Sequence, residues 1–152
     1  MTVDYNTIAK NLKFEGRAFI DGKYVDAIDG EKFENINPAT GEVLCTVSKC
    51  NHKDVDLAVK VSRKAFNSGV WSRTSPEFRK DVLLKFAELL RQTGEENSVL
   101  ECVDTGKLIG DCINEVANDA PMHFQWYGEL IDKVFGKVGP TEPSLTSLIV
   151  KE

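Results

Sequence analysis

The chain has 152 residues and a formal net charge of −5, and its basic residues are scattered among acidic ones. Nucleic acid is therefore not expected as a partner, because phosphate contacts need clustered Lys and Arg. The first ten residues have no apolar core behind a basic flank, and no apolar run approaches the ~18 residues of a membrane span, so we expect no secretory signal, no membrane association and a cytoplasmic location.

The first predicted elements are strands. Residues 1–17 are expected to be mobile and to hold at most a short helix. Asp21-Gly22 lies between the strand formers Phe19 and Tyr24. Both positions of a two-residue hairpin turn need positive φ, and Asp-Gly is a preferred pair there. A β-hairpin is therefore predicted at this point of the chain.

Residues 31–49 predict two further strands about a turn. Pro38 fixes φ in this turn and Gly41 supplies conformational freedom. Apolar residues alternate in the second strand, so one of its faces should be buried: Val43, Cys45 and Val47.

Four helical patterns follow, each with apolar residues three or four positions apart. The first should end at Gly69, and the second should begin with Ser75 as N-cap and Pro76 at its first position. Gly94 is expected to end the second helix and Gly106 the third. The length of the chain, 152 residues, suggests one domain.

The fourth helical pattern runs from Ile113 to Val134, and its phase survives Pro121. We therefore predict one long helix that is kinked at the proline. The sequence "GKVGP" at 136–140 is interpreted as the stop of this helix.

The chain closes on a strand that begins near Leu145 and contains the apolar run 148–150. Backbone N–H and C=O groups of a strand need partners, and no partner follows. We expect either a protein that ends on a bare strand or the front piece of a longer chain.

Motifs for catalysis or metal binding are not found in the usual spacings. The four cysteines form no C-x-x-C pair, and small buried or half-buried thiols are expected. His52 and His123 are far apart, with no Cys or His at ligand spacing. Two stretches stand out instead, "INPATGEVL" at 36–44 and "LECVDTGKL" at 100–108.

In this order and spacing, the two stretches resemble the N-terminal part of the aldehyde dehydrogenase superfamily. "FIDGKYVDA" is similar to the first hairpin of that family, and "RKDVLLKFAELL" and "WYGELIDKVFGKV" occupy the expected places. The resemblance covers nearly all of residues 18–152. Leu108 is a departure, since the family usually has Pro after "TGK".

The resemblance implies an α/β fold, with β-hairpins of the oligomerisation region and helices that flank a Rossmann-like domain. Residues 18–152 would be the N-terminal segment of such an enzyme and incomplete as a domain. The parent would oxidise an aldehyde to a carboxylic acid with NAD or NADP. The catalytic Cys, the general-base Glu and the Gly-rich turn of the family lie outside this stretch, so the chain alone is expected to be inactive and not to bind the dinucleotide tightly.

The resemblance also implies the partners. These are the remainder of an aldehyde dehydrogenase chain and further copies in a homo-oligomer, a dimer or a tetramer. An alternative is a standalone, non-catalytic truncated paralogue that binds or regulates full-length subunits. A third interpretation, an unrelated small α+β binding module, requires the series of motifs to be a coincidence.

Two site hypotheses follow from the resemblance. Members of the family often hold a monovalent cation inside the subunit, and the matching positions are Asn35, Ile36 and Asp104; oxygen ligands suit a hard cation. The alternative for Asp104 is a solvated or capping acid. Asp119 matches a position near the substrate entrance where an acid would attract an ammonium-bearing aldehyde, and its alternative is a surface residue before Pro121.

Overall fold

The computed structural model describes residues 3–150, in which three two-stranded antiparallel sheets alternate with helices. No helix in this range is long and apolar enough to cross a lipid bilayer. In chain order the elements are α1 (Tyr5–Asn11), β1 (Ala18–Ile20), β2 (Lys23–Val25), β3 (Lys32–Ile36), β4 (Val43–Ser48), α2 (His52–Ser68), α3 (Pro76–Gln92), α4 (Gly94–Thr105), α5 (Ile109–Cys112), the π-helix η1 (Ile113–Asp119), α6 (Ala120–Leu130), β5 (Lys137–Gly139) and β6 (Ser147–Ile149).

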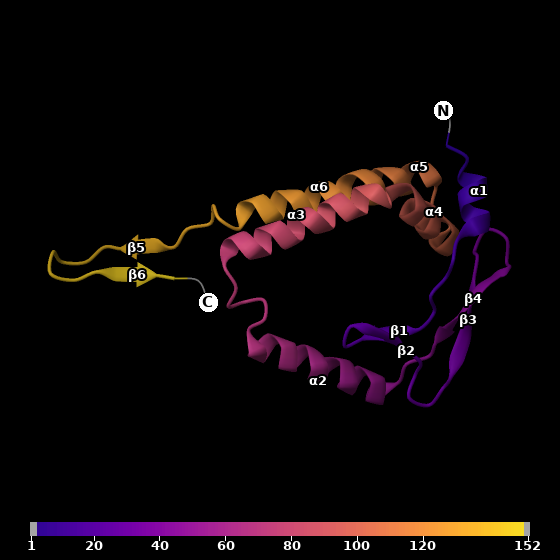
Figure 1. Cartoon of the computed structure of the whole chain (residues 1–152), viewed down its shortest axis with the longest axis horizontal. Coiled ribbons are helices and arrows are strands. Elements are labelled where there is room, and N and C mark those ends of the chain that lie inside the picture. The colour runs from indigo at the N-terminus through magenta and orange to yellow at the C-terminus, as the bar shows by residue number, and fades with distance from the viewer. Residues whose placement is uncertain (1–2, 151–152) are drawn as a thin grey trace.

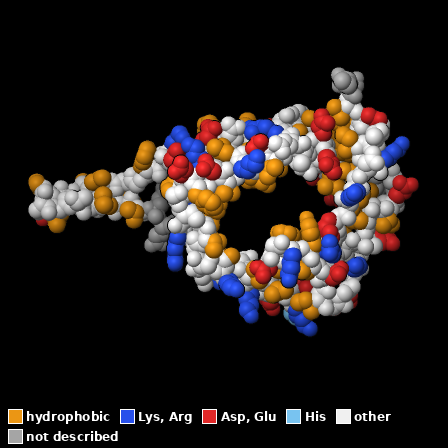
Figure 2. Space-filling view, in the orientation of Figure 1, with side chains coloured by type: hydrophobic (Ala, Val, Ile, Leu, Met, Phe, Trp, Pro, Cys, Tyr) orange, Lys and Arg blue, Asp and Glu red, His pale blue; other side chains and the backbone are white. Residues whose placement is uncertain are grey.

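The elements form an open ring with a projecting arm (Figure 1). Helices α3 and α6 lie side by side along one side of the ring, α2 lies on the opposite side, and the β5–β6 hairpin extends outward as the arm. Figure 2 shows an opening through the middle of the molecule, with hydrophobic side chains along its border. The chain therefore encloses a space rather than a core.

The short helix expected near the N-terminus is present as α1, and it lies against α4. Asp4 caps its start by accepting hydrogen bonds from two backbone N–H groups. The predicted mobility of residues 1–17 stays a prediction, and its first two residues lie outside the described range.

The first hairpin is as predicted. Asp21 and Gly22 have φ values of 54° and 76°, and Phe19 pairs with Tyr24 across β1 and β2. The two rings meet edge to face with their centroids 5.2 Å apart. The guanidinium of Arg17 lies 5.7 Å from the centre of the Tyr24 ring, so the hairpin has an aromatic face with a cation beside it.

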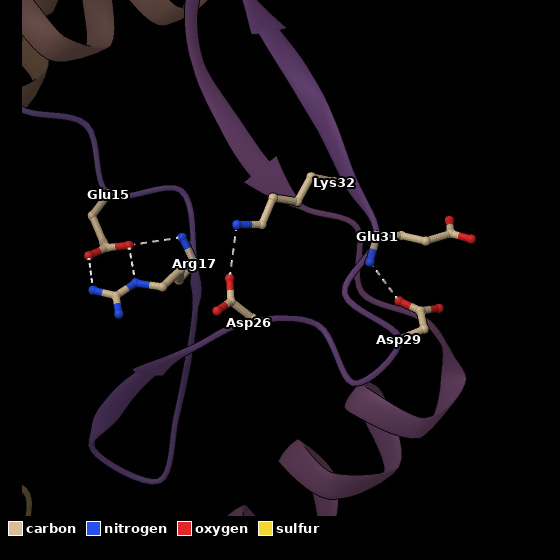
Figure 3. Close-up of polar contacts among 6 residues, drawn as sticks. All are labelled: Glu15, Arg17, Asp26, Asp29, Glu31 and Lys32. Atoms are coloured by element: carbon tan, nitrogen blue, oxygen red, sulfur yellow. Dashed lines mark hydrogen bonds and ion pairs between the residues drawn. The ribbon is translucent and has the colours of Figure 1, made fainter.

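Exposed ion pairs surround the base of this hairpin (Figure 3). Arg17 Nε and Nη2 donate to the Glu15 carboxylate at 2.8 and 2.6 Å, and these hydrogen bonds lower the pKa of Glu15 to about 2. Lys32 Nζ lies 3.2 Å from Asp26 Oδ1. Because these pairs are exposed, each contributes little to the free energy of folding.

The β3–β4 hairpin forms as expected, with an irregularity in register between Asn35 and Ile36. The prediction of a buried face on β4 is only partly met. Cys45 and Val47 are half-buried, but Val43 is 52% exposed. The prediction is wrong at Val43 because the ring leaves that end of the strand uncovered.

A buried carboxylate joins α2 to the hairpins. Asp54 is 3% exposed and accepts backbone hydrogen bonds from Ile28 and Asn51, each at 2.9 Å. Asn51 in turn caps α2 in a reciprocal capping box with Asp54. The charge is therefore satisfied by backbone donors, as a buried carboxylate requires.

Most predicted helix boundaries are confirmed. Gly69 ends α2 with φ 74°, Ser75 caps α3 through its side chain, and Pro76 occupies the first helical position. Gly94 does not end α3 as predicted. It begins α4 directly after Thr93, because its missing side chain serves helix packing rather than a turn.

The long helix around Pro121 is continuous but contains a π-helical segment. The N–H of Ala120 donates to the carbonyl of Glu115, five residues earlier. A proline has no N–H and its ring would clash with a carbonyl four residues before it. The wider π-turn accommodates the ring, and the helix ends at Leu130, short of the predicted Val134.

Helices α3 and α6 are the most extensively packed pair. The rings of Phe86 and Phe124 meet edge to face at 4.6 Å. Hydrogen bonds from Lys133 and from Lys80 lower the pKa of Asp132 to about 2. The folded state is therefore favoured by these bonds above pH 3.8, the ordinary value of the carboxyl, and loses that contribution as the pH falls toward 2.

The closing strand has a partner, which corrects the prediction of a bare strand. β6 pairs with β5, and β5 lies in the segment interpreted only as a helix stop. A Cβ atom at Gly136 would lie 2.6 Å from the carbonyl oxygen of Ile149. Glycine is needed there for the close approach of the two strands. In the sequence alone, a glycine in this role looks the same as one that ends a helix.

Few hydrophobic side chains are buried. Among residues 3–150 the buried ones are Ala27, Ala87, Val99, Cys112 and Pro121. The accessible surface is 11574 Å², whereas a compact protein of this mass exposes roughly 7,700 Å². Apolar faces on α2, α3 and α6 are consequently open.

The turn after β3 lies against the end of α4. Asn35 Nδ2 donates to Asp104 Oδ1 at 2.5 Å, across 69 positions of sequence. Gly106 has φ 74°, and a Cβ atom there would lie 2.9 Å from Cγ of Pro38. The two stretches singled out in the sequence therefore contact each other.

Substituting Gly106→Ala should lower the free energy of unfolding by about 1–2 kcal/mol, because the left-handed backbone disfavours a Cβ atom and Pro38 occupies its space. Urea unfolding followed by circular dichroism measures the change. Gly110→Ala is the matched control, since a Cβ atom there meets nothing within 4 Å, and it should be neutral or gain up to about 1 kcal/mol in its helix. Equal costs for the two variants would contradict the prediction.

Candidate functional site

The "NPATG" turn is stabilised by its own first residue. The Asn37 carbonyl accepts from the N–H of Gly41 at 2.8 Å, and the Asn37 side chain accepts from the N–H of Ala39 at 2.9 Å. Gly41 has φ 75°, which closes the turn. Asn35, which reaches Asp104 near the end of α4, lies in β3 two residues before this turn.

The structure brings together the side chains of Asn35 and Asp104, two of the three residues expected at a cation site. Asp104 is exposed, Asn35 is half-buried, and Ile36 lies at the irregularity in β3. Asp104 Oδ1 accepts a hydrogen bond from the side-chain amide of Asn35. The other carboxylate oxygen, Oδ2, is left to coordinate a cation. Within residues 3–150 no three His, Cys, Asp or Glu side chains are clustered for a metal.

A donor set of one carboxylate and neutral oxygens fits a hard cation of low charge. It does not fit zinc, which prefers Cys and His.

Asp119 is the last residue of η1 and is exposed. Its carbonyl oxygen lies 2.7 Å from Nδ1 of His123, one turn later. A carbonyl only accepts hydrogen bonds, so this contact requires a hydrogen on Nδ1. Among the described residues, no hydrogen bond or ion pair connects Asp119 with Asn35, Ile36 or Asp104.

An exposed aromatic surface continues from Asp119 along α6. Met122 is 53% exposed, and Trp126 and Tyr127 are 62% exposed. Together with His123 they line a shallow hollow of about 300 Å³.

A close helix crossing beside η1 was missed by reasoning from sequence. A Cβ atom at Gly94 would lie 2.8 Å from Cβ of Ala117. Ser98, fully buried, donates to the carbonyls of Gly94 at 2.7 Å and Cys112 at 3.2 Å. The signal that could have found it is the spacing of Gly94 and Ser98, since residues four apart share one helix face.

Two of the four cysteines, Cys112 and Cys50, have surroundings that disfavour a nucleophile. Cys112 is buried, and this burial raises the pKa of its thiol. Cys50 is exposed, and partial desolvation together with the charges of Asp54 and Asp29 raises the pKa of its thiol. Reactive cysteines need a lowered pKa, so these two thiols are unsuited to catalysis.

Open apolar surfaces border the central opening (Figure 2). Helix α3 has a groove of about 440 Å³ with mostly apolar walls. Its apolar lining residues are Phe78, Val82, Phe86 and Leu89. Helix α2 has a hollow of about 630 Å³ around Val59 and Phe66.

The aldehyde dehydrogenase family model matches residues 24–152. The chain is 39% identical over 149 residues to the aminoacetaldehyde dehydrogenase of Pseudomonas aeruginosa. The alignment covers 98% of this chain and 30% of that protein. The NADP/NAD-dependent aldehyde dehydrogenase PuuC of Escherichia coli is 38% identical over 144 residues, with 95% of this chain and 29% of that protein covered.

Solved structures give the same result. Indole-3-acetaldehyde dehydrogenase AldA of P. syringae, determined with NAD+ and IAA, superimposes with a TM-score of 0.90 and 41% identity over 95% of this chain and 29% of that chain. The expected α/β class is thereby confirmed. The chain spans about 30% of the length of the curated relatives it matches. It belongs to the aldehyde dehydrogenase family and corresponds to the N-terminal part of its members.

Proposed function

We propose that this chain is the N-terminal scaffold of an NAD(P)-dependent aldehyde dehydrogenase that oxidises an aldehyde to a carboxylic acid. The observation that carries the proposal is the match over 98% of this chain to 30% of a relative with that activity. NAD or NADP would accept the hydride in the complete enzyme. In this proposal the described residues contribute walls of the site and its charge, and the nucleophile comes from the remainder of the enzyme. Cys112 is buried, its pKa is raised, and it is a poor nucleophile.

Residues 18–152 are, in this proposal, incomplete as a domain, and the remainder of the enzyme fills the central opening. The apolar groove on α3 and the hollow on α2 support it, since both border space without a covering layer. Burial of each large apolar side chain contributes roughly 1.5–3 kcal/mol relative to exposure. A few such side chains equal the ~5–15 kcal/mol that holds a domain folded.

The arm suits self-association into a dimer or tetramer. Val138 and Leu148 on paired strands are 73% and 64% exposed, and the outer edges of a two-stranded sheet offer unpaired backbone groups. The four cysteines are all unpaired, which suits a reducing compartment such as the cytoplasm.

The test joins residues 1–152 to the rest of the related aminoacetaldehyde dehydrogenase, beginning where the alignment stops. This joined enzyme should reduce NAD+ or NADP+ with an aldehyde. The 152-residue chain alone should have no activity, bind NAD weakly and associate with itself in sedimentation.

The outcome that contradicts the proposal is an inactive joined enzyme together with a 152-residue chain that is a monodisperse, cooperatively melting monomer. That result would favour the standalone, non-catalytic alternative. Binding of this monomer to an intact relative would identify it as a regulator.

The Asp119 carboxylate is proposed to attract aldehydes that carry a positive charge. Its exposure at the end of η1, beside an open aromatic surface, supports the role, as does the relative named for aminoacetaldehyde. Two unit charges 4 Å apart in water interact by about 1 kcal/mol, which corresponds to about five-fold in kcat/KM.

Asp119→Ala in the joined enzyme should therefore lower kcat/KM about five-fold for an amino- or trimethylammonio-aldehyde and leave a neutral aldehyde unaffected. Steady-state kinetics with one aldehyde of each charge give the ratio. Asp111→Ala removes an equally exposed acid from the same helical segment and is the control. An unchanged ratio in Asp119→Ala refutes the role.

A monovalent cation is proposed as a structural cofactor, held by the Asp104 carboxylate and by oxygens of Asn35 and Ile36. The hydrogen bond from Asn35 Nδ2 to Asp104 Oδ1 supports the placement, because it brings β3, which carries the carbonyl oxygens of Asn35 and Ile36, to the Asp104 carboxylate. Binding would add to the contact between the "NPATG" turn and the end of α4.

Exchange of K+ or Na+ for tetramethylammonium at equal ionic strength should lower the thermal midpoint of the joined enzyme by about 1–2 °C, as expected for loss of a ligand at roughly ten times its Kd. Asp104→Ala should abolish this cation-dependent difference, and the Asp111→Ala control should keep it. A difference that survives Asp104→Ala would contradict the site.

A further inference from the structure

We propose that Gly94 and Ser98 of α4 are positioning residues that fix the location of the Asp119 carboxylate, by holding η1 at a close crossing with Ala117. The proposal rests on the proposed role of Asp119 in attracting charged aldehydes. It assigns a function to a contact that involves no catalytic or substrate-binding group.

The crossing leaves no space for a side chain. An added Cβ atom at Gly94 would lie 2.8 Å from Cβ and 3.0 Å from Cα of Ala117. Because the second of these atoms belongs to the backbone, it cannot move without moving the helix. Gly94 has no positive φ, so glycine is required here for space and not for conformation.

Ser98 fixes the same crossing from the next turn of α4. Its side chain is fully buried, and Oγ lies 2.7 Å from the Gly94 carbonyl and 3.2 Å from the Cys112 carbonyl. A hydroxyl has a single hydrogen to donate, so the two carbonyls share it. The second carbonyl belongs to the residue directly before η1, which ties the start of the π-helix to α4.

The π-helix transmits this placement to Asp119. Ala117 and Asp119 are two residues apart within one hydrogen-bonded helix that ends at Asp119. A π-helix is rare and usually marks a functional or strained position, and here Pro121 follows directly in α6. A shift of Ala117 away from α4 would therefore carry the carboxylate with it.

The test uses the joined enzyme and the ratio of kcat/KM for a cationic and a neutral aldehyde. Gly94→Ala should lower this ratio about two- to five-fold, through KM of the cationic aldehyde, because the carboxylate is displaced. The double variant Gly94→Ala with Ala117→Gly removes the contact with Cβ at 2.8 Å and keeps the contact with Cα at 3.0 Å, so it should restore the ratio in part. Gly110→Ala, which has open space around its Cβ position, should leave the ratio unchanged.

Ser98→Ala covers the case in which Gly94→Ala fails to fold, because it removes the hydroxyl without adding bulk. It should lower the ratio by about two-fold. A general loss of stability would change the thermal midpoint and would leave the ratio between the two aldehydes unchanged.

The inference is overturned when Gly94→Ala and Ser98→Ala change only the thermal midpoint, or when the ratio in the double variant is no higher than in Gly94→Ala alone. A changed ratio in Asp119→Ala together with an unchanged ratio in both α4 variants would reject the inference and keep the proposed role of Asp119. A changed ratio in Gly94→Ala without one in Asp119→Ala would reject both.

Discussion

The ring depends on the contact between the "NPATG" turn and the end of α4. Asn35 and Asp104 meet through one hydrogen bond, and Pro38 lies against Gly106. The contact closes a loop of about 70 residues. Closing a loop costs conformational entropy, and this cost is a constant plus a part that grows slowly with loop length. One hydrogen bond contributes only about 0.5–1.5 kcal/mol. The contact with α1 supports the same helix, and any cation held at this junction would strengthen a closure that has few other contacts.

Local signals in the sequence predicted local structure well. Asp21-Gly22 forms the predicted turn, and Ser75-Pro76 begins the predicted helix, because turn and cap preferences depend on neighbouring residues alone. Glycine was harder to interpret. Gly94 and Gly136 are needed for close approach of another segment, and no local pattern separates this role from a stop. The π-helix before Pro121 likewise needs knowledge of the packing around it.

Burial and the candidate site were predictable to different degrees. Alternation in β4 correctly identified a strand, but it could not indicate whether the covering layer lies within the same 152 residues. The family resemblance named Asn35 and Asp104 from positions 69 apart, and the structure brings them into contact. The crossing of Gly94 with Ala117 is invisible to motif matching, because small residues carry no chemistry that a motif would record.

The open interior has a consequence for biosynthesis. Polypeptides emerge N-terminus first at about 5–20 residues per second, so an enzyme of the length of these relatives would present the uncovered faces of α2 and α3 to the cell for tens of seconds before the rest of it was made. Exposed apolar surface of this kind is what chaperones bind and what aggregates at high concentration. Charged side chains within or beside the apolar hollows, such as Lys85 and Arg63, would keep the nascent ring hydrated during that interval, as charged residues beside hydrophobic segments do in other proteins.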